Sequence, residues 1–168
     1  MNISDLIIDE EFESVIPPLT EEEFELLKES VLNDGEVYHP LVVWNNIIVD
    51  GHHRYKILKE HPEVKYRIKE RAFENRYEAI SWICLNQLGR RNLNDAQKKM
   101  LIGRRYKTEK MARGASDGFR GNQHKKSVKG QNVPLPDDVH ITSSRIATEM
   151  GTNEKTVRRA EKFVDGVD

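Results

Sequence analysis

The stretch that decides the fold of the amino-terminal half reads Leu41-Val42-Val43-Trp44-Asn45-Asn46-Ile47-Ile48-Val49-Asp50-Gly51-His52-His53-Arg54-Tyr55-Lys56. Two short runs of branched apolar residues flank an Asn-Asn pair, which is typical of a tight turn between antiparallel strands. Gly51 follows the second run and permits a sharp change of direction. The pattern therefore predicts a strand hairpin that leads through a glycine turn into a helix, which ends near Glu60 because His61-Pro62 breaks it.

The helix start after Gly51 is a candidate anion site. Free backbone N–H groups at a helix amino terminus point outward and favour a negative charge. Gly51 permits a close approach, and His52, His53 and Arg54 add hydrogen-bond donors. The site therefore suits phosphate, from a nucleotide or from nucleic acid. The alternative is a purely structural turn in which Arg54 is salt-bridged to an acidic helix.

Local signals predict further elements on both sides of this stretch. Thr20 and Glu23 form a capping-box pattern that starts a helix, and Asn33-Asp34-Gly35 stops it. The segment before Pro17 shows no regular pattern and is expected to be irregular. The remaining predicted elements are a third strand at 66–69 and helices at about 76–89 and 94–111.

Charge is strongly segregated along the chain, although the net charge is only −1. Residues 1–36 hold twelve Asp or Glu and one Lys, whereas residues 89–130 hold thirteen Lys or Arg and three acidic residues. Such segregation favours a basic surface for a polyanion. The alternative is a pair of solvated faces that attract each other.

Several features point to a cytoplasmic, nucleoid-associated protein. No run of about 18 apolar residues could span a membrane, and the acidic amino terminus is unlike a secretory signal. The single cysteine, Cys84, fits a reducing compartment, and its apolar neighbours indicate a core residue. Cysteine and histidine never cluster as ligand pairs, so no metal site is expected.

The stretch that predicts the fold near the carboxyl end reads Ser143-Ser144-Arg145-Ile146-Ala147-Thr148-Glu149-Met150-Gly151-Thr152-Asn153-Glu154-Lys155-Thr156-Val157-Arg158-Arg159-Ala160. Ala147 is the small residue needed where two helices cross closely. Gly151, four positions later, tolerates positive φ in a tight turn. Asn153 is a suitable N-cap for the second helix. The spacing predicts a helix-turn-helix, and the alternative is an ordinary helical hairpin whose basic residues face water.

The second helix of a helix-turn-helix lies in the major groove of DNA. An Arg fork can bind guanine through two hydrogen bonds, whereas Lys and Thr more often contact the backbone. The candidate DNA-binding residues are Asn153, Glu154, Lys155, Thr156, Arg158, Arg159 and Lys162, together with Arg104 and Arg105 of the preceding basic helix.

Two motifs resemble the ParB/sulfiredoxin superfamily. The ParB arginine box, G-E-R-R-x-R, corresponds to residues 51–56, where Gly51 and Arg54 match. The ParB stretch E-N-L-Q-R-x-x-L-N corresponds to residues 86–94. The matches there are Leu88, Arg90, Leu93 and Asn94. The order of domain, basic helix and helix-turn-helix is also similar to ParB-domain proteins of phages, plasmids and integrated elements.

The resemblance implies a nucleotide site, with CTP or another nucleotide and Mg²⁺ as candidate cofactors. The residues implicated are Gly51, His52, His53 and Arg54, with Arg90 and Arg91 as further candidates. Asn86-Gln87 replaces the Glu-Asn pair that supports nucleotide and metal in ParB, which argues against hydrolysis. His52 replaces the sulfiredoxin cysteine, so that chemistry is not expected.

Together these observations predict an α+β protein: a small ParB/sulfiredoxin-like α/β domain followed by an all-α helix-turn-helix DNA-binding region. The expected organisation is a first domain at 1–74, connecting basic helices at 75–111, a flexible basic linker or loop at 112–139, and the helix-turn-helix at 140–168. We expect a sequence-specific, homodimeric protein that binds double-stranded DNA in partition, replication control or transcription regulation. The alternative is an enzyme that uses residues 51–54, either a nucleotide hydrolase or a ParB-like nuclease.

Overall fold

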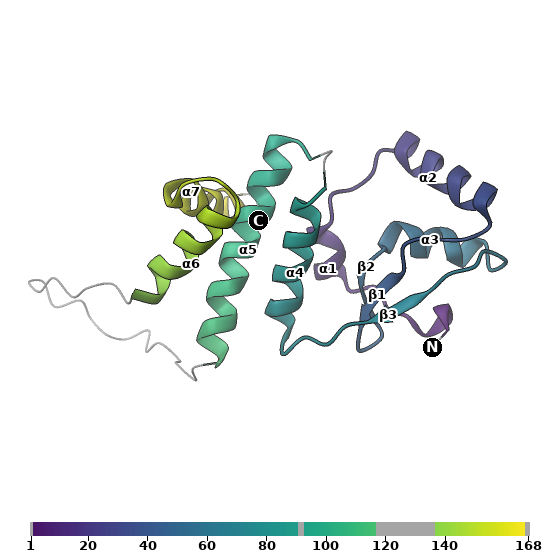
Figure 1. Cartoon of the computed structure of the whole chain (residues 1–168), viewed down its shortest axis with the longest axis horizontal. Coiled ribbons are helices and arrows are strands. Elements are labelled where there is room, and N and C mark those ends of the chain that lie inside the picture. Colours follow the sequence, from purple (N-terminus) through teal and green to yellow (C-terminus); the bar gives the residue numbers. More distant parts are fainter. Residues whose placement is uncertain (1, 91–92, 117–136, 167–168) are drawn as a thin grey trace, which may run out of the picture. The chain divides into compact units, whose positions relative to one another are not determined.

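The computed structural model describes residues 2–90, 93–116 and 137–166, and the chain divides into two compact units, Met1–Ala79 and Ile80–Asp168 (Figure 1). We call them the amino-terminal unit and the carboxy-terminal unit. The first contains the three strands, whereas the second is helical. None of the described helices has both the length and the apolar character needed to cross a bilayer.

The amino-terminal unit is built around a three-stranded sheet with the strand order β2-β1-β3. The central strand β1 pairs with β2 in antiparallel and with β3 in parallel orientation. The elements of this unit are η1 (Ile3–Asp5), α1 (Glu10–Val15), α2 (Glu21–Asp34), β1 (Leu41–Trp44), β2 (Ile47–Asp50), α3 (His52–Glu60), β3 (Ile68–Glu70) and the first turn of α4 (Arg76–Leu88).

Local chemistry explains the elements that the sequence predicts in this unit. Asn45 and Asn46 have φ values of 49° and 66°, as a tight hairpin turn requires of both its central residues. The Thr20 hydroxyl accepts a hydrogen bond from the Glu23 amide at 3.2 Å, and the Glu23 carboxylate accepts one from the Thr20 amide at 2.8 Å. The hairpin and the capping box are therefore confirmed, while the third strand lies at 68–70 rather than 66–69.

The expectation of an irregular segment before Pro17 is wrong, because α1 forms there. Asp9 caps this short helix by accepting hydrogen bonds from the amides of Glu11 at 3.0 Å and Phe12 at 3.1 Å. A helix this short depends on tertiary packing. That packing comes from Phe12, which is fully buried and stacks on the Trp44 ring with 6.3 Å between centroids.

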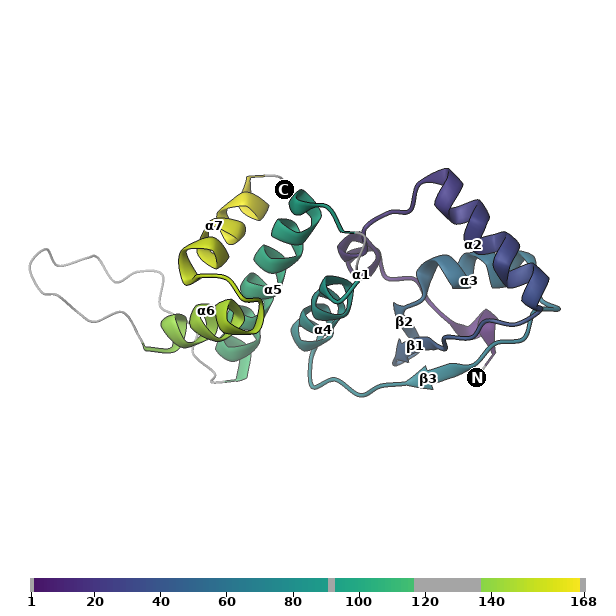
Figure 2. The same ribbon diagram turned by 45° about the horizontal axis from the view of Figure 1, so that its top comes forward.

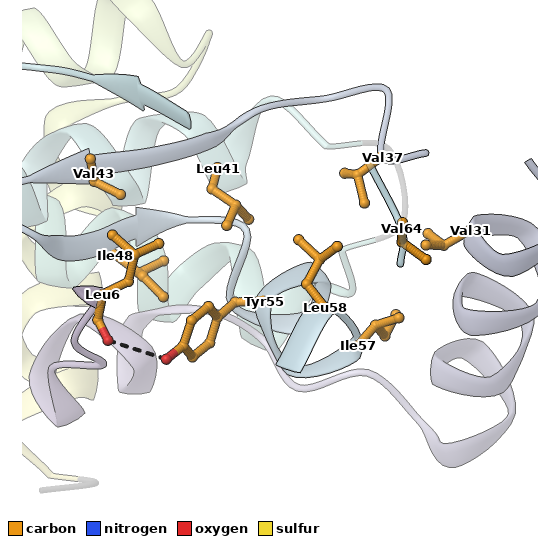
Figure 3. Close-up of a cluster of buried hydrophobic side chains, with 10 residues drawn as sticks. All are labelled: Leu6, Val31, Val37, Leu41, Val43, Ile48, Tyr55, Ile57, Leu58 and Val64. Carbon is orange, nitrogen blue, oxygen red and sulfur yellow. Dashed lines mark hydrogen bonds between the residues drawn. The ribbon is translucent and has the colours of Figure 1, made fainter. Parts of the chain in front are cut away.

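The core of the amino-terminal unit lies between the sheet and α3, with η1 and α2 at its edges (Figure 3). Leu41 and Val43 of β1 and Ile48 of β2 are fully buried and meet side chains of α3. The Tyr55 hydroxyl donates a hydrogen bond to the Leu6 carbonyl at 3.1 Å. The start of α3 is thereby held against both the sheet and the amino-terminal segment.

The carboxy-terminal unit contains the remainder of α4 and three further helices: α5 (Asp95–Ser116), α6 (Asp137–Glu149) and α7 (Glu154–Asp165). The helix α5 packs against both α6 and α7 (Figure 2). Tyr106 of α5 lies in one core cluster with Ile146 and Ala147 of α6 and Val157 of α7. Cys84 of α4 is fully buried, as predicted, and burial raises the pKa of its thiol to about 12.

Helices extend from both sides into residues 112–139, which the sequence predicts as a basic linker or loop. The helix α5 continues past Met111 to Ser116, and α6 begins at Asp137. Residues 117–136 lie outside the described part of the chain. The helix predicted over 94–111 packs within the carboxy-terminal unit against α6 and α7.

Candidate nucleic-acid interface and anion site

A sharp turn joins α6 to α7. Gly151 has φ 60°, and the Thr152 amide donates a hydrogen bond to the Ala147 carbonyl at 2.9 Å. The Asn153 side chain then caps α7 by accepting a hydrogen bond from the Thr156 amide at 2.9 Å. Glycine, small residue and cap thus occupy the positions where the sequence predicts a bend between two helices.

The helix α7 has an apolar face and a cationic face. Val157, Ala160 and Val164 are buried. Residues three or four positions apart share a helix face, so Lys155, Arg159 and Lys162 lie on the side opposite these three. All three cationic residues are exposed, as are Asn153 and Thr156. We call Lys155, Arg159 and Lys162 the α7 cationic stripe.

Two of the predicted DNA-binding residues, Arg158 and Glu154, form an ion pair with each other. The Arg158 guanidinium donates a hydrogen bond to the Glu154 carboxylate at 3.0 Å, and 42% of the Arg158 side chain remains exposed. The same carboxylate oxygen accepts a hydrogen bond from the Ser143 hydroxyl of α6 at 3.2 Å. Glu154 therefore links the first turn of α7 to α6 and orients Arg158 beside the α7 cationic stripe.

Arg105, predicted as a DNA-binding residue, has a structural position instead. Its side chain is only 3% exposed, and its Nε donates to the Glu109 carboxylate at 2.9 Å. It also pairs with Glu149 of α6, and Arg145 joins both carboxylates. Burial acts to raise the pKa of Glu149, but these guanidinium groups hold it below its usual value. The pairs fasten α6 to α5, so the Arg105 side chain does not lie on the surface.

Two other basic residues of α5 form ion pairs with acidic residues of α7. Lys107 pairs with Asp165 at 3.0 Å, and Lys110 pairs with Glu161 at 2.7 Å. Arg104 is half-buried on the same helix. Part of the basic charge in the carboxy-terminal unit is therefore used in ion pairs between its helices. The α7 cationic stripe is one of the exposed basic surfaces among the described residues of this unit.

The start of α3 has the predicted strand–glycine–helix geometry. Gly51 adopts φ 101° as the N-cap, and a Cβ added there would lie 2.6 Å from Leu41 Cδ2. Glycine offers no side chain to cap the first amides of the helix. The Arg54 side chain pairs with Asp50 of β2 at 2.9 Å. The ion pair of Arg54 is therefore with the preceding strand, and not with an acidic helix as the structural alternative expected.

A cleft of about 430 Å³ lies beside this helix start. We call it the α1–α3 cleft, and it is lined by Glu10, Glu13, Ser14, Ile16, Pro18, His52, His53 and Lys56. It therefore brings together two of the predicted phosphate-binding side chains but does not include Arg54. Arg90 belongs to the carboxy-terminal unit, and Arg91 lies outside the described residues.

A salt bridge and a buried imidazole contribute to the electrostatics of the α1–α3 cleft. Lys56 Nζ pairs with a Glu13 carboxylate oxygen at 2.7 Å, and this hydrogen bond lowers the pKa of Glu13. His52 is only 2% exposed, and burial lowers the pKa of its imidazole to about 4. Among the described residues, neither ring nitrogen of His52 has a hydrogen-bond partner. A buried, unpaired imidazole is costly and is a common sign of a ligand site.

The residues of α1 in this cleft were missed by sequence reasoning. Glu10 and Glu13 line it only because α1 folds where an irregular segment was expected. The available signal was Asp9 followed by an acidic first turn, which is a good helix start. The signal is weak in so short a segment, and no spacing in the sequence indicates that α1 lies beside α3.

Comparison with known proteins supports the fold. No protein-family model matches the chain, and no curated protein matches it. A solved structure described as a Pnob8-like ParB-N domain superposes with a TM-score of 0.67 at 18% sequence identity, over 95% of this chain. The chain has a ParB-N-like fold. It spans 66% of the length of that ParB-N structure. The resemblance predicted from residues 51–56 and 86–94 is therefore confirmed for the fold.

Proposed function

We propose that this protein binds double-stranded DNA as a ParB-type protein, with α6 and α7 acting as a helix-turn-helix. The observation that carries the proposal is the two-faced character of α7. Val157, Ala160 and Val164 are buried, whereas Lys155, Arg159 and Lys162 are exposed on the opposite side. A rigidly packed helix with a cationic outer stripe matches the requirements for reading a major groove.

The residues of the stripe suit different contacts. Arg159 can reach a guanine edge through two hydrogen bonds, whereas Lys155 and Lys162 neutralise phosphates. Glu154 orients Arg158 at the edge of this surface and, as an anion near phosphate, also opposes indiscriminate binding. The protein would act as a homodimer on a specific duplex, in partition, replication control or transcription of a phage, plasmid or integrated element.

The double variant Lys155→Ala/Arg159→Ala is expected to weaken DNA binding by at least about tenfold, because each side chain supplies a phosphate or base contact. The slope of log affinity against log salt should also fall by about 1 to 2. Fluorescence anisotropy on a duplex selected from genomic fragments, measured at several salt concentrations, gives both quantities.

The control variant is Lys65→Ala/Lys69→Ala, which removes the same charge from exposed positions of the amino-terminal unit. It should leave affinity and salt slope within about twofold of the parent protein, because these residues lie outside α7. Equal losses in the two double variants would contradict the proposal. Selection without any preferred duplex would exclude sequence specificity.

A second candidate function, in the same protein, is nucleotide binding in the α1–α3 cleft. It is favoured by two features of the described residues: the start of α3 has no side-chain cap, and neither ring nitrogen of His52 has a hydrogen-bond partner. The amides of His52 and His53 and the ammonium group of Lys56 would hold phosphate oxygens. The carboxylates of Glu10 and Glu13 repel a polyphosphate, so a divalent cation is expected to accompany it.

Calorimetry with CTP and ATP, with and without Mg²⁺, tests this site. We expect binding that requires Mg²⁺ and falls at least about tenfold in Lys56→Gln, because that change also leaves Glu13 unpaired beside the phosphates. Lys59→Gln is the matched control, since Lys59 is on the same helix but not in the cleft. Phosphate release during the same incubation would favour the enzymatic alternative over binding without hydrolysis.

A further inference from the structure

We propose that an anion entering the α1–α3 cleft binds together with one proton, which His52 takes up. The inference rests on the nucleotide site proposed above and concerns how that site is regulated. It makes nucleotide binding dependent on pH in the range between neutral and mildly acidic.

The geometry of His52 carries the inference. This residue is the first of α3, lines the cleft and is 2% exposed, and neither of its ring nitrogens has a partner among the described residues. A neutral imidazole carries one donor and one acceptor, whereas the imidazolium carries two donors. Phosphate oxygens accept hydrogen bonds only, so they pair better with the protonated ring.

The charged groups around His52 do not protonate it on their own. Glu13 of α1 and Asp50 of β2 favour the imidazolium, whereas His53 and Lys56 of α3 oppose it. Glu13 is compensated by Lys56 at 2.7 Å, and Asp50 by Arg54 at 2.9 Å. Glu10 also lines the cleft. Burial is the largest influence, and it keeps the ring neutral with a pKa of about 4 when no anion is present.

A bound phosphate changes this balance, because it places additional negative charge beside the buried ring. The pKa of His52 then rises, and binding and protonation become thermodynamically linked. Between the pKa values of the free and bound states, the affinity increases by up to about tenfold for each pH unit lowered. Above the bound-state pKa, His52 no longer makes the affinity change with pH.

The test is calorimetry of the full chain with CTP and Mg²⁺ at pH 6.5, in buffers of different ionisation enthalpy, which counts the protons taken up on binding. The parent protein should take up more protons than His52→Gln, whose side chain does not titrate. Subtracting the variant cancels protonation of the nucleotide itself. His39→Gln is the control, since His39 is exposed and lies outside the cleft. It should behave as the parent protein does.

A second measurement follows the His52 ring resonances by NMR in the parent protein, so the inference remains testable if His52→Gln does not fold. In the CTP-bound state the ring should titrate at a pH well above that of the free state. Binding with equal proton uptake in the parent and His52→Gln, or a ring that stays neutral when CTP is bound, would overturn proton coupling while leaving the nucleotide site intact. Absence of binding from pH 5.5 to 7.5 would overturn both.

Discussion

Gly103→Ala is expected to lower the free energy of unfolding of the carboxy-terminal unit by about 3 kcal/mol. A Cβ at this position would lie 2.2 Å from the Ala160 carbonyl oxygen, 2.6 Å from the Ala160 carbonyl carbon and 2.7 Å from Val164 Cγ2. Two of these three atoms belong to the α7 backbone and cannot rotate away. The higher helix propensity of alanine contributes about 1 kcal/mol in the opposite direction and does not offset the clash.

Urea unfolding followed by the fluorescence of Trp82, in a Trp44→Phe background, reports on the unit concerned. Gly89→Ala is the matched control, because its Cβ would find its nearest neighbour at 3.5 Å, which is ordinary contact. DNA binding should fall with Gly103→Ala as well, since the same contact positions the α7 cationic stripe. Unchanged stability in Gly103→Ala would show that α5 and α7 do not cross closely at this glycine.

The contact at Gly103 illustrates what the sequence can and cannot predict. A glycine within a helical pattern is simply an unfavourable residue until the partner helix is known. Local signals predicted the structure correctly where one short segment contains the whole cause: the Asn45-Asn46 turn, the Thr20 capping box and the glycine turn at Gly51 are all confirmed. Each of these depends on residues within a few positions of one another.

Predictions that needed a distant partner were less successful. Arg105 is basic and lies on a predicted basic helix, yet it is buried because Glu149 of α6 meets it. The helix α1 was missed because its stability comes from Phe12 against Trp44, far along the chain. The glycine turn into α3 was predicted correctly, but the side chains around it are arranged differently from the expectation: Arg54 is paired with Asp50, and residues of α1 line the cleft beside the turn.

The amino-terminal unit is expected to lose stability in mild acid because of His52. Burial lowers the pKa of this imidazole from 6.5 to about 4 in the folded protein. Between these two values the unfolded chain binds a proton that the folded chain does not, so lower pH favours unfolding. The part of the free energy of unfolding that depends on a neutral His52 is fully present above about pH 6.5 and is lost as the pH falls towards 4. One pKa unit corresponds to about 1.4 kcal/mol, so the loss amounts to roughly 3 kcal/mol.

The measurement is urea unfolding at a series of pH values, followed by the fluorescence of Trp44 in a Trp82→Phe background. Trp44 packs against Phe12 and Phe73 and therefore reports on the amino-terminal unit. In His52→Gln the pH dependence between 6.5 and 4 should be weaker by the His52 contribution, while His39→Gln should retain it. Equal pH dependence in all three proteins would mean that the buried ring is already protonated, or already paired, in the folded chain.

Because a bound anion is expected to raise the pKa of His52, adding CTP and Mg²⁺ should reduce the acid sensitivity of the parent protein and leave that of His52→Gln unchanged. The pH dependence of stability and the pH dependence of ligand binding thus both report on the protonation state of His52.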